Sequence, residues 1–251
     1  MPSLQQIKGD FIAEGASNLA TIVMPSLRII SGAFKLQRLT VLDTLKCTEL
    51  TKVGSIEWIT LPKLTSLSFD SKVTEADSVR ISDTQLTSLT GIDIKTVRAF
   101  NIDNNKYLKD VNINLNHVTE SLSLEFNLKT LSISFPQLIW ANNITIIAAG
   151  SIALPKLQHV NGSINFGNNS FTTIECKNLT AVEQTLAFTG NPKLTNLTFP
   201  LLTEIGGGFK IHNNSALTII DGFPLLKTVR GAIDFVGNFQ KYVPTILLIH
   251  H

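Results

Sequence analysis

A repeat of about 22 residues runs along the chain and limits its fold more than any other feature. The clearest copies start at Leu186, Phe209 and Ile233, each followed by a second apolar residue two positions later and by Asn five positions later. We call the first apolar residue of each copy its anchor. The anchors predicted from the sequence are Ile12, Phe34, Ile56, Val79, Phe100, Leu122, Ile144, Ile164, Leu186, Phe209 and Ile233. A fixed period of this length is typical of stacked repeat proteins.

The periodicity inside each copy indicates strands. Apolar residues alternate with polar ones around each anchor, and no copy has room for a helix of about ten residues. The Leu-x-Leu-x-x-Asn pattern of leucine-rich repeats is present without their convex helix. We therefore predict an all-β fold, a right-handed parallel β-helix or leucine-rich-repeat-like solenoid with about 22 residues per coil and about 10 to 11 coils. Residues 1–239 are expected to form this single domain, and residues 240–251 a non-repeat, irregular tail.

Two recurring residue types mark the predicted corners of the coil. An asparagine five residues after the anchor tolerates left-handed backbone and can hydrogen-bond to the next coil, so we predict a structural ladder. Its members are Asn105, Asn127, Asn169, Asn191, Asn214 and Asn238. Glycine two residues before the anchor predicts a second tight corner. The glycines at this position are Gly32, Gly54, Gly162, Gly207 and Gly231. Polar residues at 74–78 predict a looser coil between Val73 and Gly91.

Composition excludes several classes of function. The net charge is +2 with Lys and Arg scattered, which argues against a nucleic-acid partner. The longest apolar run, residues 144–154, is too short to span a membrane. Cys47 and Cys176 occupy inward apolar positions six coils apart, too far for a disulfide, so we predict two buried free thiols. Trp58 and Trp140 are both predicted to face the core rather than to serve as sugar platforms.

Residues that act together in catalysis or metal binding should occupy matching positions of the repeat. Enzymes that cut polysaccharides need clustered carboxylates, one acting as acid and another as base or nucleophile. The candidate aspartates fall at different repeat positions and form no paired column; they are Asp70, Asp83, Asp93, Asp103, Asp110 and Asp221. No histidine pair has metal-ligand spacing within a coil. We predict no catalytic residue, no metal ligand and no cofactor.

Asn-x-Ser/Thr sequons indicate a secreted glycoprotein. The candidate N-glycosylation sites all follow residue 140 and are Asn143, Asn161, Asn168, Asn178, Asn196 and Asn213. Most fall at outward or corner positions of the predicted coil.

Several segments resemble the fungal GPI-anchored cell-wall-organisation proteins, which are related to sporulation-specific wall proteins and to receptor L domains. The segments are residues 53–58, 73–79, 86–93, 135–143, 205–224 and 229–239. The Trp-Ala-Asn-Asn of residues 140–143 and the Gly-Ala-Ile-Asp-Phe of residues 231–235 are the most specific. The resemblance implies an L-domain-like solenoid in a secreted, N-glycosylated wall protein that is needed for wall integrity. It also implies extracellular location, at the wall or the outer face of the plasma membrane.

The chain departs from the family at both ends. The family's signal peptide, first and last coils, Ser-rich stalk and GPI signal are not recognisable, so we interpret the chain as a fragment of a longer array. The resemblance implies wall polysaccharide or wall proteins as partners, and GPI attachment for the relatives. The predicted function is a non-enzymatic wall protein. Two alternatives remain open, a polysaccharide-active β-helix enzyme and a receptor-like ligand-binding L domain.

Overall fold

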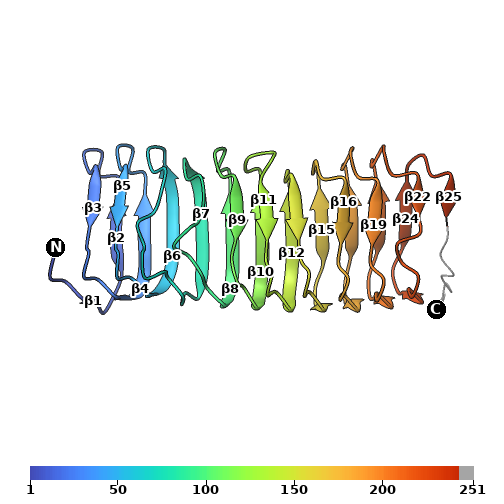
Figure 1. Cartoon of the computed structure of the whole chain (residues 1–251), viewed down its shortest axis with the longest axis horizontal. Coiled ribbons are helices and arrows are strands. Elements are labelled where there is room, and N and C mark those ends of the chain that lie inside the picture. The colour runs from blue at the N-terminus through green and yellow to red at the C-terminus, as the bar shows by residue number, and fades with distance from the viewer. Residues whose placement is uncertain (243–251) are drawn as a thin grey trace.

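The computed structural model describes residues 1–242, which form a parallel β-solenoid without a helix. The coils follow one another along a single axis, so the N-terminus and residue 242 lie near opposite ends of an elongated molecule (Figure 1). The strands are β1 (Gln6–Ile7), β2 (Phe11–Glu14), β3 (Thr21–Val23), β4 (Ile29–Gln37), β5 (Thr44–Lys46), β6 (Lys52–Leu61), β7 (Ser78–Thr84), β8 (Thr96–Asp103), β9 (Asp110–Asn112), β10 (His117–Glu125), β11 (Ser132–Ser134), β12 (Trp140–Ile147), β13 (Ser151–Ala153), β14 (His159–Val160), β15 (Ile164–Gly167), β16 (Thr173–Glu175), β17 (Ala181–Val182), β18 (Leu186–Thr189), β19 (Asn196–Thr198), β20 (Glu204–Ile205), β21 (Phe209–His212), β22 (Ile219–Ile220), β23 (Thr228–Val229), β24 (Ile233–Val236) and β25 (Lys241–Tyr242).

The anchors lie directly over one another in a 16-stranded parallel sheet. Successive pairs run from Phe11↔Phe34 to Phe209↔Ile233, in ten steps of 20 to 24 residues. The solenoid predicted from the repeat is therefore confirmed. Its first anchor is Phe11 and not Ile12, because Ile12 pairs with outward-facing Lys35 and is 57% exposed. Alternation in a short strand fits either of two neighbouring residues, and the partner strand decides between them.

A second face of the coil carries shorter strands. They pair in parallel as β3 with β5, β11 with both β9 and β13, β16 with β19, and β22 with β25. The last of these pairs matters for the predicted irregular tail, because Lys241 and Tyr242 continue the array as strand β25 beside Ile219 and Ile220. For those two residues the prediction is wrong. Residues 243–251, the rest of that tail, lie outside the described residues.

The interior is one hydrophobic cluster that extends from Ile22 to Val229. Aromatic rings in neighbouring coils contact one another within it, as Phe34 does with Trp58 at a centroid distance of 5.6 Å. Trp58 is fully buried, which confirms its predicted inward position. Cys47 and Cys176 are also fully buried and unpaired, as predicted. Burial raises the pKa of each thiol to about 12, because a thiolate would lose its hydration there.

The predicted inward position of Trp140 is wrong. Trp140 pairs with His159 on the outward side, whereas its neighbour Ala141 pairs with Val160 and is buried. Three residues separate Ala141 from its anchor Ile144, but four separate Val160 from the next anchor. Counting back from the anchor therefore misplaced Trp140 by one residue. The Trp140 indole is half-buried, and its N–H donates to Asn161 Oδ1 at 3.1 Å.

The asparagine positions form a hydrogen-bonded column inside the coil. Asn105, Asn127, Asn169, Asn191 and Asn214 are buried. Asn191 shows the pattern: its backbone N–H and its Nδ2 donate to Asn214 Oδ1 at 2.9 and 3.0 Å, and Nδ2 also donates to Phe166 O at 3.0 Å. Asn238 follows in sequence register but is exposed, unlike the five buried members.

The left-handed backbone predicted for these asparagines belongs instead to the residue before them. Ten successive coils have a positive φ at the position four residues after the anchor, which we call the corner position. Its occupants are Gly15, Arg38, Thr60, Asp83, Asn104, Phe126, Ala148, Asn168, Gly190 and Asn213. Only two of them are glycines, so composition did not reveal the corner. The buried asparagine that follows acts through its carboxamide hydrogen bonds rather than through its backbone conformation.

The glycines before the anchors allow close contact between coils. A Cβ on Gly54 would lie 2.6 Å from Ser31 O, closer than real atoms approach. None of the five predicted corner glycines has a positive φ, so close approach is what requires glycine there. In the middle coils the same position carries Asp77, Arg98 and Glu120. Arg98 forms ion pairs with both carboxylates, at 3.0 Å to Asp77. These pairs raise the pKa of Arg98, the Glu120 hydrogen bond most of all.

A polar groove beside strand β9 as candidate functional site

The coil that contains β7 departs from the regular pairing. Its segment at residues 89–93 should pair forward with the strand of the next coil. Instead it pairs back to Val73, whose N–H donates to Gly91 O at 2.8 Å and whose carbonyl accepts from Asp93 N at 2.8 Å. Forward pairing is limited to a bridge between Ser88 and Asp110. The looser coil that the polar residues 74–78 predicted lies here. Strand β9 is left as the edge of its sheet.

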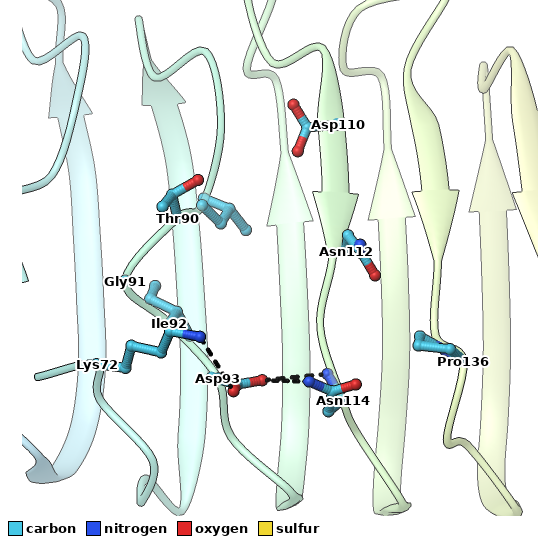
Figure 2. Close-up of a pocket in the computed structure, with 10 residues that line it drawn as sticks. Lys72, Thr90, Gly91, Ile92, Asp93, Asp110, Asn112, Asn114 and Pro136 are labelled. Atoms are coloured by element: carbon cyan, nitrogen blue, oxygen red, sulfur yellow. Dashed lines mark hydrogen bonds and ion pairs between the residues drawn. The ribbon is translucent and has the colours of Figure 1, made fainter. Parts of the chain in front are cut away.

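A groove of about 360 Å³ occupies the gap. Residues 89–93 form one wall, while Asp110, Asn112 and Asn114 follow one another along the other wall (Figure 2). Lys72 and Pro136 contribute from the coils on either side. Most of the lining side chains are polar: hydroxyl, carboxylate, carboxamide and ammonium groups.

Both ends of the groove are closed by contacts within the protein. At one end stands the Ser88–Asp110 bridge. At the other, Asn114 crosses the gap and donates from Nδ2 to Asp93 Oδ1 at 2.9 Å, as Figure 2 shows. Lys72 Nζ lies 3.7 Å from the second Asp93 oxygen, so the charge of Asp93 is balanced. Asp110 is exposed and has no ion-pair partner among the described residues. The groove therefore carries one uncompensated negative charge.

Backbone strain accompanies this departure from the repeat. Gly91 has a φ of 102°, and a Cβ added to it would lie 2.9 Å from Phe69 Cβ. Lys72 also has a positive φ, 60°, away from the regular corner position. Glycine adopts a positive φ without strain, whereas for Lys72 this conformation costs free energy and persists only where the surroundings hold it. The groove is thus maintained by an arrangement that the regular coils do not need.

The repeat positions of the candidate carboxylates do not show which of them lie together in the structure. Asp93 and Asp110 line the same groove, although they occupy different repeat positions. Residues 89–93 have left the repeat register, which is why the periodicity could not show this. Asp93 is held by Asn114 and Lys72. Asp70, Asp83, Asp103 and Asp221 do not line the groove.

The sequon asparagines differ in their surroundings. Five of them, Asn161, Asn168, Asn178, Asn196 and Asn213, are exposed. Asn143 is half-buried; its Oδ1 accepts from Ser163 N at 2.9 Å and its Nδ2 donates to Glu120 O at 3.3 Å, so its carboxamide joins three coils. Asn168 and Asn213 stand at the left-handed corner position.

No group of three or more His, Cys, Asp or Glu side chains in residues 1–242 is arranged to hold a metal ion. Nor does that part of the chain contain a helix of the length and hydrophobicity required to cross a bilayer.

Together, the stacked coils and the lateral polar groove define a parallel β-solenoid repeat protein with a small-ligand-sized surface site. No protein-family profile matches the chain, and no solved structure matches it. Named relatives do. Protein ecm33 of Aspergillus fumigatus is 39% identical over 95% of this chain and 60% of its own length. A cell surface GPI-anchored protein of Arthroderma benhamiae is 37% identical, over 96% and 62% respectively.

A third relative, sporulation-specific protein 2 of Saccharomyces cerevisiae, is 34% identical over 98% of this chain and 49% of its own length. Along nearly its whole length the chain is therefore similar to proteins named for the fungal cell surface, the cell wall or sporulation, which confirms the resemblance seen in the sequence. It spans about half to three fifths of the length of these relatives.

Proposed function

We propose that this chain is part of a non-enzymatic extracellular protein that supports the organisation and integrity of a fungal cell wall. The observation that carries the proposal is the similarity, along nearly the whole chain, to proteins named for the wall or the cell surface. The structure adds physical support, since most hydrogen bonds of the array join one coil to the next and rigidify a long scaffold. Its partners would be wall polysaccharide or other wall proteins.

Disruption of the gene tests the wall role. A strain without the protein is expected to become sensitive to wall-perturbing dyes and to regain resistance when the gene is restored. The tagged protein is expected at the wall or the outer face of the plasma membrane, held there by a GPI anchor as the name of the Arthroderma benhamiae relative describes that protein. Unchanged dye resistance in the disrupted strain would contradict the proposal.

N-glycosylation is part of the same proposal and makes a graded prediction. The five exposed sequon asparagines are expected to carry glycans in protein secreted from a eukaryotic host. Asn143 is expected to show the lowest occupancy in the folded, secreted fraction, because it alone of the six is half-buried and its carboxamide joins three coils. Glycopeptide mass spectrometry measures occupancy at each site. High occupancy at Asn143 together with low occupancy at Asn161 would contradict the ranking.

The enzyme alternative has one observation in its favour, the presence of Asp93 and Asp110 in one groove. A glycosidase needs one carboxyl that donates a proton and a second that acts as base or nucleophile. Asp93 instead accepts from Asn114 at one carboxyl oxygen and lies 3.7 Å from Lys72 Nζ at the other, so both of its oxygens are already engaged within the protein. We therefore expect no release of soluble sugar from β-glucan or chitin. Release that disappears in Asp110→Asn and persists in Asp221→Asn would establish the enzyme instead.

A further inference from the structure

We propose that the groove beside β9 binds a short stretch of neutral saccharide. The proposal rests on the wall role above only for the biological source of the sugar; the groove's own chemistry defines the ligand class. A volume of about 360 Å³ is at the small end of ligand pockets and suits about one or two pyranose rings.

The hydrogen-bonding groups of the groove match a ligand rich in hydroxyls. Each sugar hydroxyl both donates and accepts one or more hydrogen bonds. The exposed Asp110 carboxylate accepts only, Asn112 donates and accepts through its carboxamide, and the Thr90 hydroxyl does both. Pro136 offers apolar surface for the C–H face of a ring. Figure 2 shows these groups distributed over both walls, so a ring lying between them would be held from two sides.

Charge excludes acidic ligands. Lys72 lies near Asp93 and balances it, whereas Asp110 keeps its negative charge within the groove. A phosphate or a uronic acid would meet this carboxylate as a like charge, which disfavours binding. A neutral sugar gains charge-assisted hydrogen bonds from the same carboxylate.

Groove length argues against a peptide. An extended peptide could add to the free edge of β9, as peptides add to other sheet edges. That mode needs a continuous open edge, and here the Ser88–Asp110 bridge closes one end while Asn114 and Asp93 close the other. The open stretch covers little more than the three residues of β9. A compact ring fits between these closures, and a strand does not.

Calorimetric titration of the 251-residue chain tests the proposal. The probes are laminarihexaose, chitohexaose and mannohexaose as neutral saccharides, and an oligogalacturonate as the acidic comparison. Saturable binding of at least one neutral probe is expected, with no binding of the acidic one. The three neutral arms distinguish glucan, chitin and mannan as the source. Absence of binding for all neutral probes, or preferred binding of oligogalacturonate, overturns the proposal.

Variants locate the site. Asp110→Asn is expected to weaken binding about tenfold, because it removes a charged acceptor. Asn112→Trp fills the groove and is expected to abolish binding. Both side chains are exposed, so circular dichroism should show an unchanged fold. Asp221→Asn, at an exposed aspartate outside the groove, is the matched control and should bind as the unaltered chain does. Equal affinity in all three variants overturns the proposal.

The wall assay separates this proposal from the wall role. A strain that carries Asn112→Trp should share part of the dye sensitivity of the disrupted strain if saccharide binding contributes to it. Full resistance of that strain, combined with lost binding in vitro, would leave the wall role standing and overturn the physiological part of the groove proposal. Full resistance of the disrupted strain itself contradicts the wall role.

Discussion

Asn191 illustrates how single buried residues hold neighbouring coils together. Its carboxamide satisfies backbone groups and side chains on both sides: Oδ1 accepts from Asn169, and Nδ2 donates to Phe166 O and to Asn214. A buried backbone N–H without a partner costs about 1–3 kcal/mol. The column therefore stabilises the array by preventing this loss in the coils that carry a buried asparagine.

Asn191→Ala removes that carboxamide and should lower the free energy of unfolding by about 2–4 kcal/mol, since the Asn169 N–H is left buried without an acceptor. Urea unfolding followed by circular dichroism measures the change. Asn196→Ala, at an exposed asparagine, is the control and should stay within about 0.5 kcal/mol. Equal midpoints for the two variants would contradict the structural role of the column.

Thr60 tests the strained corner. It is β-branched and has a φ of 57°, a region that such residues avoid. Thr60→Asn should raise stability by about 0.5–1 kcal/mol, because Asn adopts left-handed backbone more readily. In the opposite sense, Gly190→Ala should destabilise, since its φ of 69° strains a residue that carries a Cβ. Thermal unfolding of the two variants should shift in opposite directions; a loss of stability in Thr60→Asn would be the contrary result.

The buried thiols give a pH prediction. Burial raises the pKa of Cys47 and Cys176 from 9.0 to about 12, so the folded state binds protons more tightly than the unfolded state. Their contribution to stability is then complete below about pH 9 and is lost progressively as pH rises toward 12. Native protein should resist alkylation by iodoacetamide at pH 8, while urea-unfolded protein reacts at both cysteines. Stability measured from pH 8.5 to 11 should fall less steeply in Cys176→Ala. Rapid labelling of the native protein would contradict this.

At the scale of elements, the sequence determined pairing well where the repeat was regular. Anchors such as Phe34 and Ile56 were found because apolar alternation and coil length agreed. Trp140 was misplaced because its coil has a shorter corner, which counting cannot detect. The groove was not predicted either, because it forms where residues 89–93 pair back to Val73. The choice of partner strand is a tertiary effect, and a single copy of the repeat does not encode it.

Gly91 should control that departure from the repeat. Gly91→Ala places a Cβ 2.9 Å from Phe69 Cβ at a φ of 102°, so a loss of about 1–3 kcal/mol is expected. Gly9→Ala is the matched control, because its Cβ would meet nothing within 4 Å and its φ is not positive. Urea midpoints should fall for Gly91→Ala and remain nearly unchanged for the control. A harmless Gly91→Ala change would show that the loop can relax away from the strained geometry.

At the scale of the whole molecule, each coil contacts its neighbours in register, and one hydrophobic cluster connects them. We infer from this continuity that residues 1–239 behave as one domain. Stability of such an array is roughly a sum of coil and interface contributions. The length of the array should therefore change by whole coils without loss of the fold.

Deletion of residues 186–208 removes one coil and brings Phe209 into the position of Leu186. The shortened chain should fold, and its longest dimension in small-angle scattering should decrease by about 5 Å. Deletion of residues 186–197 alone, about half a coil, would place Thr198 and Pro200 at the inward positions of Leu186 and Phe188 and should abolish folding. If both deletions fold equally well, register between coils is less important than the structure implies.

The left-handed corner has a consequence for how such a chain acquires its shape. Four of its ten occupants, Arg38, Thr60, Phe126 and Ala148, are residues that avoid this backbone conformation when nothing constrains them. A peptide that contains a single turn of the sequence would therefore straighten at this point. Neighbouring turns must already be in place to hold the bend, so the smallest piece able to keep its form must contain several turns. Growth of the ordered structure, rather than its first turn, is the favourable step.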